Sequence, residues 1–373
     1  MRFLHVSDLH IGKKLARLSL MEDQQEILRQ IVDMAAQADC VLVAGDVFNR
    51  AQPGQDALQL AGWFFEQLAA LRVPTAVIAG NHDNAELIGY CAGILRSSGI
   101  YACGGYDGQL QKITLSDASG EVDVWMMPFL RPANVRPHHP DAQIESYADA
   151  IRCVIENTPI DRTRRNVLVA HQYVAGATVC ESEELIIGGV DQIPAELFDD
   201  FDYVAMGHLH TPQRVGANDL RYSGSPLAYS VSEAGAQKCA LLVDMDARGD
   251  VQVERKPFRP MRELREVRGL FADVMSLPYS EDYVSVVLTD EHRPMDAAGA
   301  LRVNFPNMVG LVWANREGLV VEHVELEAVE TIGPEEHIAQ FYRQQNGGRE
   351  MSDEQMEIVR AIFEEVSGEV GAK

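Results

Sequence analysis

The stretch Phe3-Leu4-His5-Val6-Ser7-Asp8-Leu9-His10 is an apolar run of strand length that ends in two residues able to bind a metal ion. Asp8 and His10 are two residues apart, so in extended backbone their side chains point to the same side. The stretch therefore predicts a buried strand with a metal-binding pair at its carboxyl end.

The same arrangement recurs along the chain. Apolar runs at residues 41–44, 76–79, 167–170 and 203–206 lead to Asp46, Asn81, His171, and the pair His208 and His210. In an open α/β sheet the carboxyl ends of the strands meet at one edge, where ligands bind. One such dipeptide arises easily by chance, but the whole ordered series predicts a ligand cluster in one crevice.

The candidate ligands offer carboxylate, amide and imidazole atoms and no thiolate. This set suits two divalent ions, most simply Mn²⁺, with Mg²⁺ as the alternative. Ions about 3.5 to 4 Å apart need a bridging carboxylate, for which Asp46 is the candidate. We assign one ion to Asp8, His10, Asp46 and His210, and the other to Asp46, Asn81, His171 and His208. Spacing alone does not decide between His208 and His210.

Three further polar residues lie beside the predicted ligands. Cleavage of a phosphodiester requires an activated water, charge stabilisation on the phosphoryl oxygens and a proton for the leaving oxygen. His82 is the candidate for the last two tasks, and Asp83 for orienting its imidazole. Asn49 is left out of the ligand set because asparagine after a strand is often only a turn former.

Helical periodicity separates the predicted strands. Apolar residues recur at helical spacing in residues 21–38 and 56–71, and later strands are predicted at 122–127 and 240–244. This alternation predicts an α/β domain in which two sheets stack between helical layers.

Prolines and glycines divide the rest of the chain. Lys256-Pro257-Phe258-Arg259-Pro260 predicts a boundary, after which strands at 283–289 and 308–314 predict a smaller α+β unit. Gly333-Pro334 predicts a second break, followed by two short amphipathic helices that must pack on their own domain or on a partner. The predicted domains are residues 1–255, 256–332 and 333–373.

The charge balance argues against a protein that grips duplex DNA unaided. The chain has 56 acidic and 32 basic residues and a formal net charge of −24, whereas such proteins present a basic face. Arg131, Arg136, Arg164 and Arg165 are candidates for a path to the site, and exposed loop charges are the alternative for each.

The cysteine pattern and the hydropathy indicate the cellular compartment in which we expect the protein. The six cysteines contain no CxxC pair, which predicts reduced structural thiols. The chain enters a strand at once without a leader, and no apolar run has membrane-spanning length, so we expect a cytoplasmic protein with no membrane partner.

The motifs Ser7-Asp8-Leu9-His10, Gly45-Asp46-Val47-Phe48, Gly80-Asn81-His82-Asp83, His171 and Gly207-His208-Leu209-His210 resemble those of the calcineurin-like metallophosphoesterases. The stretch Arg221-Tyr222-Ser223-Gly224-Ser225-Pro226 and the tail narrow the resemblance to the bacterial SbcD nucleases, relatives of Mre11.

This resemblance implies a four-layer α-β-β-α sandwich with a capping domain and a C-terminal helix pair. It also implies a Mn²⁺-dependent 3'-5' exonuclease on duplex DNA, with endonuclease activity on single strands and hairpins. The implied partners are an SbcC-like (Rad50-like) ATPase, gripped by the tail helices, and a second copy of the chain within a heterotetramer.

The sequence departs from the family pattern at one position, and two other functions stay open as alternatives. Many relatives carry His three residues after the bridging Asp, where this chain has Asn49, so an end-positioning role of that His is in doubt here. The same site chemistry would also serve a phosphoesterase of small nucleotides or cyclic nucleotides, although a cap and a helical tail speak against it. A non-catalytic scaffold is the other alternative, and the intact His82 and ligand set speak against that.

Overall fold

The computed structural model describes residues 1–183, 191–216, 219–314, 343, 351–352 and 355–356. The chain forms two compact units, and the larger one comprises Met1–Val267, Leu277–Val286 and Ala298–Leu311. The predicted C-terminal helix pair falls almost entirely outside the described residues. Among the described residues, no helix has the length and apolar character needed to cross a membrane.

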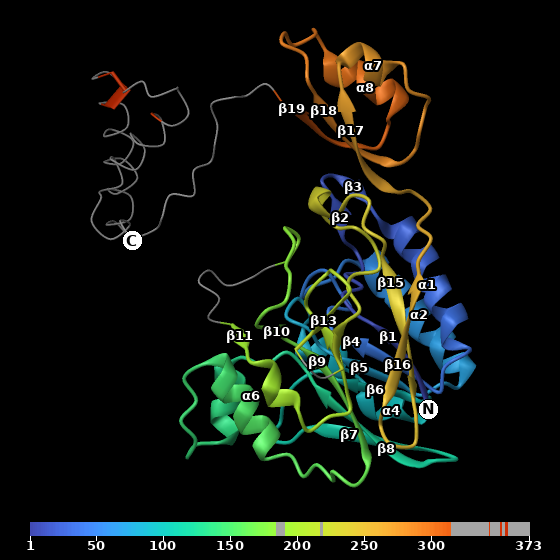
Figure 1. Ribbon diagram of the computed structural model, residues 1–373, viewed down its shortest axis with the longest axis vertical. Coiled ribbons are helices and arrows are strands. Elements are labelled where there is room, and N and C mark those ends of the chain that lie inside the picture. The colour runs from blue at the N-terminus through green and yellow to red at the C-terminus, as the bar shows by residue number, and fades with distance from the viewer. Residues whose placement is uncertain (184–190, 217–218, 315–342, 344–350, 353–354, 357–373) are drawn as a thin grey trace. The chain divides into compact units, whose positions relative to one another are not determined.

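The first sheet of the larger unit contains the N-terminal strand (Figure 1). Its strands, in spatial order, are β16 (Val251–Pro257), β15 (Cys239–Met245), β1 (Arg2–Val6), β4 (Cys40–Ala44), β5 (Thr75–Ile78) and β6 (Ile100–Cys103). Strands β1, β4, β5 and β6 run parallel, and β15 is antiparallel to both β1 and β16. The carboxyl ends of β1, β4 and β5 therefore lie side by side at one edge.

The second sheet has the same mixed character. Its strands, in spatial order, are β13 (Gln213–Val215), β14 (Leu220–Tyr222), β12 (Tyr203–Gly207), β9 (Arg165–His171), β8 (Gly120–Met127) and β7 (Gln111–Asp117). The four inner strands run parallel, and the edge strands β7 and β13 are antiparallel to their neighbours.

The two sheets share one apolar core. Phe3 and Leu42 of the first sheet and Val124, Val167 and Tyr203 of the second are fully buried in one cluster. Because the inner strands β4, β9 and β12 are buried on both faces, their sequences show a mostly continuous apolar run instead of alternation.

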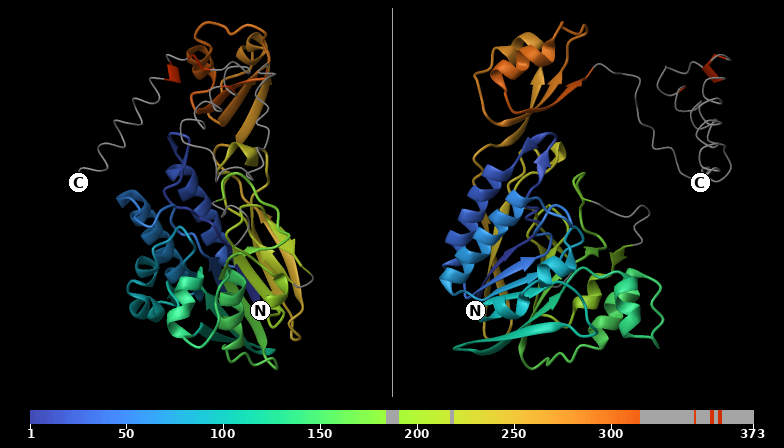
Figure 2. Two further views of the ribbon diagram at one scale, coloured as in Figure 1. Left: turned by 90° about the vertical axis from the view of Figure 1, so that its left-hand side faces the viewer. Right: turned by 180° about the vertical axis from the view of Figure 1, so that it is seen from behind.

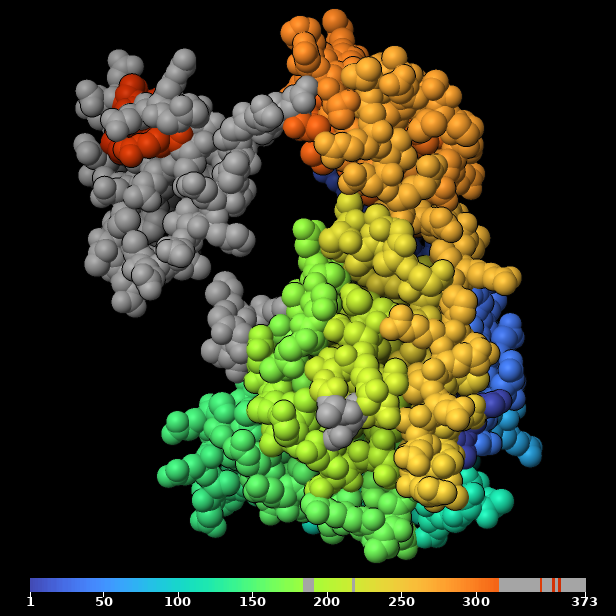
Figure 3. Space-filling view, viewed as in Figure 1, coloured from blue at the N-terminus to red at the C-terminus, as the bar shows by residue number. Residues whose placement is uncertain are grey.

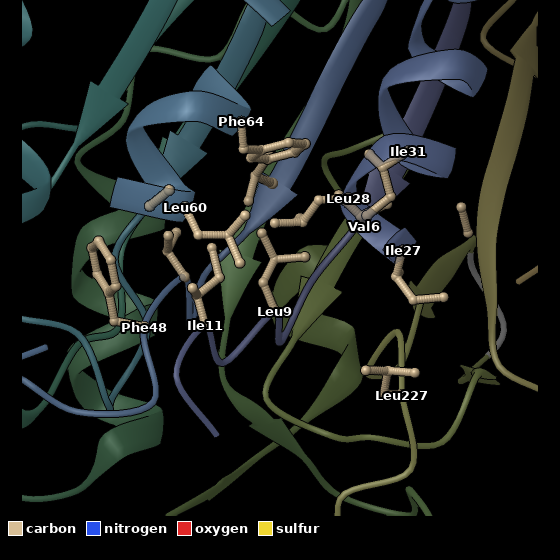
Figure 4. Close-up of a cluster of buried hydrophobic side chains, with 14 of the residues drawn as sticks. Val6, Leu9, Ile11, Ile27, Leu28, Ile31, Phe48, Leu60, Phe64 and Leu227 are labelled. Atoms are coloured by element: carbon tan, nitrogen blue, oxygen red, sulfur yellow. The ribbon is translucent and has the colours of Figure 1, made fainter. Parts of the chain in front are cut away.

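Helices cover the outer faces of both sheets (Figure 2). Helices α1 (Met21–Ala35) and α2 (Gln55–Leu71) pack on the first sheet, and α6 (Tyr147–Glu156) packs on the second. Ile27, Ile31 and Phe64 point from α1 and α2 toward Leu9 and Ile11, which follow β1 (Figure 4). Burying such a side chain contributes about 1.5 to 3 kcal/mol, so these helices hold the loop after β1 in place.

The remaining elements are short. They are β2 (Lys14–Leu15), β3 (Leu18–Ser19), α3 (Ala85–Gly89), α4 (Ala92–Ser97), α5 (Pro132–Val135), η1 (Arg136–His138), β10 (Tyr173–Val174), β11 (Gln192–Ile193), η2 (Ala195–Phe198) and η3 (Val231–Glu233). A separate sheet, in the order β17 (Leu264–Gly269), β18 (Tyr283–Leu288) and β19 (Met308–Trp313), is accompanied by α7 (Phe271–Met275) and α8 (Ala297–Asn304).

The predicted α/β fold with two sheets is confirmed; both sheets are mixed, and a small further sheet lies in the C-terminal part of the described chain. The apolar runs at residues 3–6, 41–44, 76–79, 167–170 and 203–206 all correspond to strands, and each predicted carboxyl end is within one residue of the observed one. The first helix ends at Ala35 and not at Ala38, because its last turn tightens to bonds between residues three apart, such as Ala38 N–H to Ala35 O.

Candidate metal centre

Five strand ends converge on the site. Asp8 and His10 follow β1, Asp46 follows β4, and Asn81 follows β5. His171 ends β9, and His208 and His210 follow β12, so the second sheet completes a crevice that the first sheet begins. All the imidazoles and carboxylates of this set are buried.

The backbone at these strand ends adopts conformations that L residues rarely take. The φ angles of Asp8, His10, Asp46 and His208 are +53°, +44°, +52° and +106°. Two backbone bonds hold the first two turns together, from Asp8 N–H to Gly45 O at 3.1 Å and from His10 N–H to Asp46 O at 2.9 Å. Strain of this kind persists only where the surrounding structure fixes it, and it concentrates at functional sites.

Asp46 lies at the centre of the cluster. Its Oδ2 atom is 3.4 Å from His171 Nε2, 3.6 Å from His10 Nε2 and 4.0 Å from His82 Nε2. Asp8 joins Asp46 and His171 in one group of ligand atoms within 4.8 Å of one another, and joins His10 and His210 in a second such group. The carboxylate of Asp46 therefore stands between two sets of donors.

Asn81 organises the donors on one side of Asp46. Its Oδ1 atom is 3.0 Å from His171 Nε2 and 2.9 Å from His208 Nδ1. His171 uses its other ring nitrogen on the Ala44 carbonyl at 2.8 Å, which makes Nδ1 the donor and turns Nε2 toward Asp46. These contacts group Asn81, His171 and His208, as the assignment of the second ion requires, and the assignment itself stays a prediction.

On the other side of Asp46, two imidazoles face each other. His10 Nε2 and His210 Nε2 are 3.1 Å apart. Burial lowers the pKa of His10 to about 3 and that of His210 well below its ordinary value, so both rings are neutral. Burial, with repulsion from Asp46, raises the pKa of Asp8 to about 7. Within the described residues, the ion pairs of Asp46 involve only histidines.

These features fit a pair of divalent cations. His10 Nδ1 and His208 Nε2 are buried without a hydrogen-bond partner in the described part of the chain, which shows unsatisfied bonding capacity around the site. Neutral imidazole and carboxylate oxygen are the forms that bind divalent ions, and a cation would relieve the repulsion between Asp8 and Asp46.

Three glycines clear space for this packing. A Cβ atom on Gly80 would lie 2.1 Å from Asp46 Oδ1, and one on Gly45 would lie 2.4 Å from His171 Nδ1. A Cβ atom on Gly207 would lie 1.9 Å from the Ala44 carbonyl oxygen. The glycine that precedes each of these ligand motifs is therefore required by close approach.

His82 and Asp83 lie beside the cluster in different ways. His82 is partly exposed, its backbone N–H donates to Asp46 Oδ1 at 2.9 Å, and its ring packs edge-on against His10. The Asp83 carboxylate accepts bonds from the N–H groups of Val47, Phe48 and Gly80 at 2.8 to 3.0 Å. Asp83 thus ties the loops after β4 and β5 together, a structural task that the sequence did not predict; its predicted action on His82 stays a prediction.

The structure separates the four candidate arginines. Arg131 lies with its guanidinium 5.4 Å from the Phe129 ring, and that ring stacks on His208 at 6.1 Å, so Arg131 is close to the site. Arg136 donates to the Ile144 carbonyl at 2.7 Å and holds its own loop.

Arg164 and Arg165 lie at the wrong end of β9 for the predicted path to the site. Arg165 is buried in a salt bridge to Asp117 at 2.6 Å, and Arg164 pairs with Glu121 at 2.7 Å. His171 stands at the other end of the same strand, about 20 Å away at 3.3 Å per residue. Both guanidinium groups are therefore engaged in ion pairs away from the crevice.

Sequence reasoning missed a set of residues behind His210. Ser182, Glu183, Glu233 and Lys238 form hydrogen bonds there. None of them lies in a motif or at a strand end, so only the tertiary structure reveals them.

Comparison with known proteins adds the family. Residues 1–212 match the calcineurin-like phosphoesterases, and residues 257–346 match the family described as the Type 5 capsule protein repressor C-terminal domain. The chain is 30% identical over 335 residues to the SbcD component of the SbcCD nuclease from Staphylococcus epidermidis, covering 87% of each chain. It is 28% identical to the same component from Staphylococcus saprophyticus, covering 98% of this chain and 100% of the relative.

Two solved structures are also similar. TT1561 of Thermus thermophilus has 14% identity and a TM-score of 0.39, covering 68% of this chain and 98% of that one. GAP50 of Plasmodium has 11% identity and a TM-score of 0.40, covering 69% of this chain and 89% of that one. Since the family match spans more than half of the chain and the first relative aligns over most of it, the chain belongs to the calcineurin-like phosphoesterases, a family of hydrolases, and within them to the SbcD proteins.

Proposed function

We propose that this chain is the nuclease subunit of a DNA-processing complex and cleaves phosphodiester bonds with two divalent ions, most simply Mn²⁺. The observation that carries the proposal is the buried Asp46 carboxylate with His10, His82 and His171 around it. The names of the relatives support a nuclease in particular.

The ligand assignment follows the two donor groups. Asp8, His10, Asp46 and His210 would hold one ion, and Asp46, Asn81, His171 and His208 the other. When bound, such ions activate a water and neutralise charge on the phosphoryl oxygens.

The remaining tasks fall to the protein's own side chains. His82 is the most exposed imidazole of the cluster, which supports the proposal that its Nε2 atom reaches a substrate and gives a proton to the leaving oxygen. Asp83 fixes the loop of His82 to the loop of Asp46 by accepting two bonds from the backbone N–H groups of Val47 and Phe48, which would hold the acid at a constant distance from the bridging carboxylate.

We further propose duplex DNA as the substrate of a 3'-5' exonuclease, and single strands and hairpins as substrates of an endonuclease. Arg131 over Phe129 supplies one cation near the site. The formal net charge of −24 supports a second proposal, that an SbcC-like ATPase supplies most of the phosphate contacts. The tail helices proposed to bind that ATPase lie outside the described residues.

A homodimer through the helices of the nuclease domain is part of the same proposal. Tyr90 and Ile94, at α3 and α4, are 72% and 70% exposed, and Leu58 of α2 is 42% exposed. Leu58 and Tyr90, with Phe65 and Leu95, line an apolar cavity of about 140 Å³. Large exposed apolar side chains around such a cavity support a protein interface.

The domain division into residues 1–255, 256–332 and 333–373 and a cytoplasmic location also remain proposals. The alternative function is a phosphoesterase acting on small nucleotides or cyclic nucleotides. The C-terminal match at residues 257–346 favours the nuclease, because a small substrate needs no such addition.

The test is Mn²⁺-dependent digestion of end-labelled duplex and hairpin DNA by the full chain, with and without the ATPase and ATP. A nucleotide phosphodiester serves as the comparison substrate. We expect chelator-sensitive cleavage of DNA. Turnover of the small phosphodiester with none of the DNA would replace the nuclease by the alternative.

A further inference from the structure

A hydrogen-bonded relay stands behind one of the predicted metal ligands. His210 Nδ1 is 2.5 Å from Ser182 Oγ, and the same Ser182 hydroxyl donates to Glu233 Oε1 at 2.6 Å. His210 and Glu233 are buried. The three side chains therefore form a line that starts at the ring nitrogen opposite the metal site.

The direction of the protons in this line is fixed by the serine. A hydroxyl carries one hydrogen, and the Ser182 hydrogen goes to the Glu233 carboxylate. Ser182 Oγ must then accept from His210, which places a hydrogen on Nδ1. The lone pair of Nε2 is left facing His10 Nε2 at 3.1 Å, on the side of Asp8 and Asp46.

Lys238 keeps the far end of the relay negative. Its ammonium group forms an ion pair with Glu233 Oε2 and donates to Ser225 Oγ at 3.0 Å and to the His210 carbonyl at 2.9 Å. All three ammonium hydrogens therefore have acceptors. One of these acceptors is the backbone carbonyl of His210, the residue whose ring begins the relay. A buried ion pair adds little stability on its own. A role in holding His210 therefore explains the Lys238–Glu233 pair better than stability does.

Ser182 belongs to a segment, residues 178–183, that hydrogen bonds hold against the strand and loop around His210. Thr178 and Gln213 exchange two hydrogen bonds of 2.7 Å. The Glu183 carboxylate accepts from the backbone N–H groups of His210 at 2.6 Å and Cys180 at 2.5 Å. In Figure 3 part of the segment between β14 and β15, coloured yellow, is visible at the molecular surface. Glu233 and Lys238, which belong to this segment, are buried.

We infer that Ser182 is a positioning residue that, with Glu233 and Lys238, locks His210 in the Nδ1–H tautomer and so presents Nε2 to a metal ion. The inference rests on the proposed metal site, and it adds how one ligand is prepared for binding. Partners of this kind typically change metal affinity about 10- to 100-fold when they are removed.

The test uses the full chain freed of metal by a chelator. Ser182→Ala removes the relay, Ser182→Thr retains the hydroxyl, and Ser230→Ala is the matched control, because Ser230 Oγ also donates to Glu233 Oε1, at 3.0 Å, without contacting His210. Mn²⁺ titration calorimetry measures affinity, and ¹⁵N NMR of the histidine rings reports the tautomer of His210, assigned by its loss in His210→Gln.

We expect Ser182→Ala to bind one Mn²⁺ ion about 10- to 100-fold more weakly and to lose the uniform Nδ1–H signal. Ser182→Thr and Ser230→Ala should match the wild type, and circular dichroism should show all variants folded. Wild-type affinity in Ser182→Ala, or an Nε2–H tautomer in the metal-free wild type, overturns the relay alone. Absence of Mn²⁺ binding by the wild type overturns the proposed metal site itself.

Discussion

The carboxyl and amino ends of the central strands differ in how their buried charged side chains are paired. At the carboxyl ends, Asp8 and Asp46 are buried among imidazoles, and His10 Nε2 faces His210 Nε2 at 3.1 Å. At the amino end of β9, Arg165 makes a two-bond contact with Asp117, at 2.6 and 3.0 Å.

Other charges at the amino end are also matched. The Met1 ammonium group lies 2.9 Å from Asp117, and Lys112 lies 2.7 Å from the fully buried Asp123. Thr114 donates to the second oxygen of Asp123. One end of the sheets thus satisfies its charges internally and supports stability, while the other leaves ligand atoms that a cation would satisfy.

Asp46→Ala, at the carboxyl ends of the strands, is the substitution with the largest expected effect on Mn²⁺ binding and DNA cleavage. Removing the central carboxylate should abolish Mn²⁺ binding and lower DNA cleavage about a thousandfold or more, since metal ions supply several kcal/mol of transition-state stabilisation. Saturating Mn²⁺, at about 100 times Kd, should stabilise the wild type by about 2.7 kcal/mol per ion and should not stabilise the variant. Thermal unfolding with and without Mn²⁺ measures this, and an unchanged Mn²⁺ response would refute the central place of Asp46.

His82→Ala separates catalysis from metal binding at the same end. We expect turnover to fall about 10²- to 10⁴-fold, the usual contribution of a positioned acid, because the leaving oxygen loses its proton source. The Mn²⁺-induced rise in melting temperature should remain. Single-turnover cleavage and the thermal shift are measured on one preparation; unchanged turnover would remove His82 from the reaction, and loss of the thermal shift would make it a ligand.

Arg165→Ala tests the opposite end. It leaves Asp117 without its main partner and should lower the free energy of unfolding by about 2 to 3 kcal/mol, less than for a fully buried pair because Asp117 is 23% exposed. Mn²⁺ affinity and DNA cleavage should stay as in the wild type under conditions where the variant is folded. Urea unfolding measures the stability, and a loss of Mn²⁺ affinity would show that the two ends are coupled.

The sequence predicted for a physical reason that these side chains gather at the carboxyl ends of the strands. A fully buried parallel strand needs an unbroken apolar run, and a ligand at its end stands out against that run, as Asp46 does after Val41 to Ala44. Ligand position is then fixed by the strand order that α/β folds impose.

The partners of charged residues could not be read in the same way. Arg164 and Arg165 form a local basic run whose shortest ion pairs, with Glu121 and Asp117, reach residues far away in the chain. The relay from Ser182 to Glu233 likewise joins two loops that share no pattern. Such contacts depend on how loops pack, which periodicity does not encode.

The dependence of stability on pH in the acid range gives a finer test of the charge pairing at the amino end of β9. The hydrogen bonds from Arg165 hold the pKa of Asp117 well below its usual range. A carboxyl whose pKa is lower in the folded state stabilises the protein above its unfolded pKa, near ~4, and loses that contribution as the pH falls below it. Asp117→Asn should therefore flatten the fall in stability below about pH 4. Urea unfolding across the acid range measures the slope, and equal slopes in both proteins would contradict this role of Asp117.

The smallest expected effect compares one arginine from each end. Arg131 lies over Phe129 beside the site, whereas Arg162 is 74% exposed and pairs with Asp200 near the amino end of β9. If Arg131 contacts a DNA phosphate, Arg131→Ala should lower kcat/KM on duplex DNA about threefold to tenfold and reduce the slope of log affinity against log salt by about one. Arg162→Ala should change neither quantity, since its guanidinium is far from the crevice. Cleavage assays across a salt series measure both variants, and equal responses would mean that position relative to the metal centre has no bearing on substrate binding.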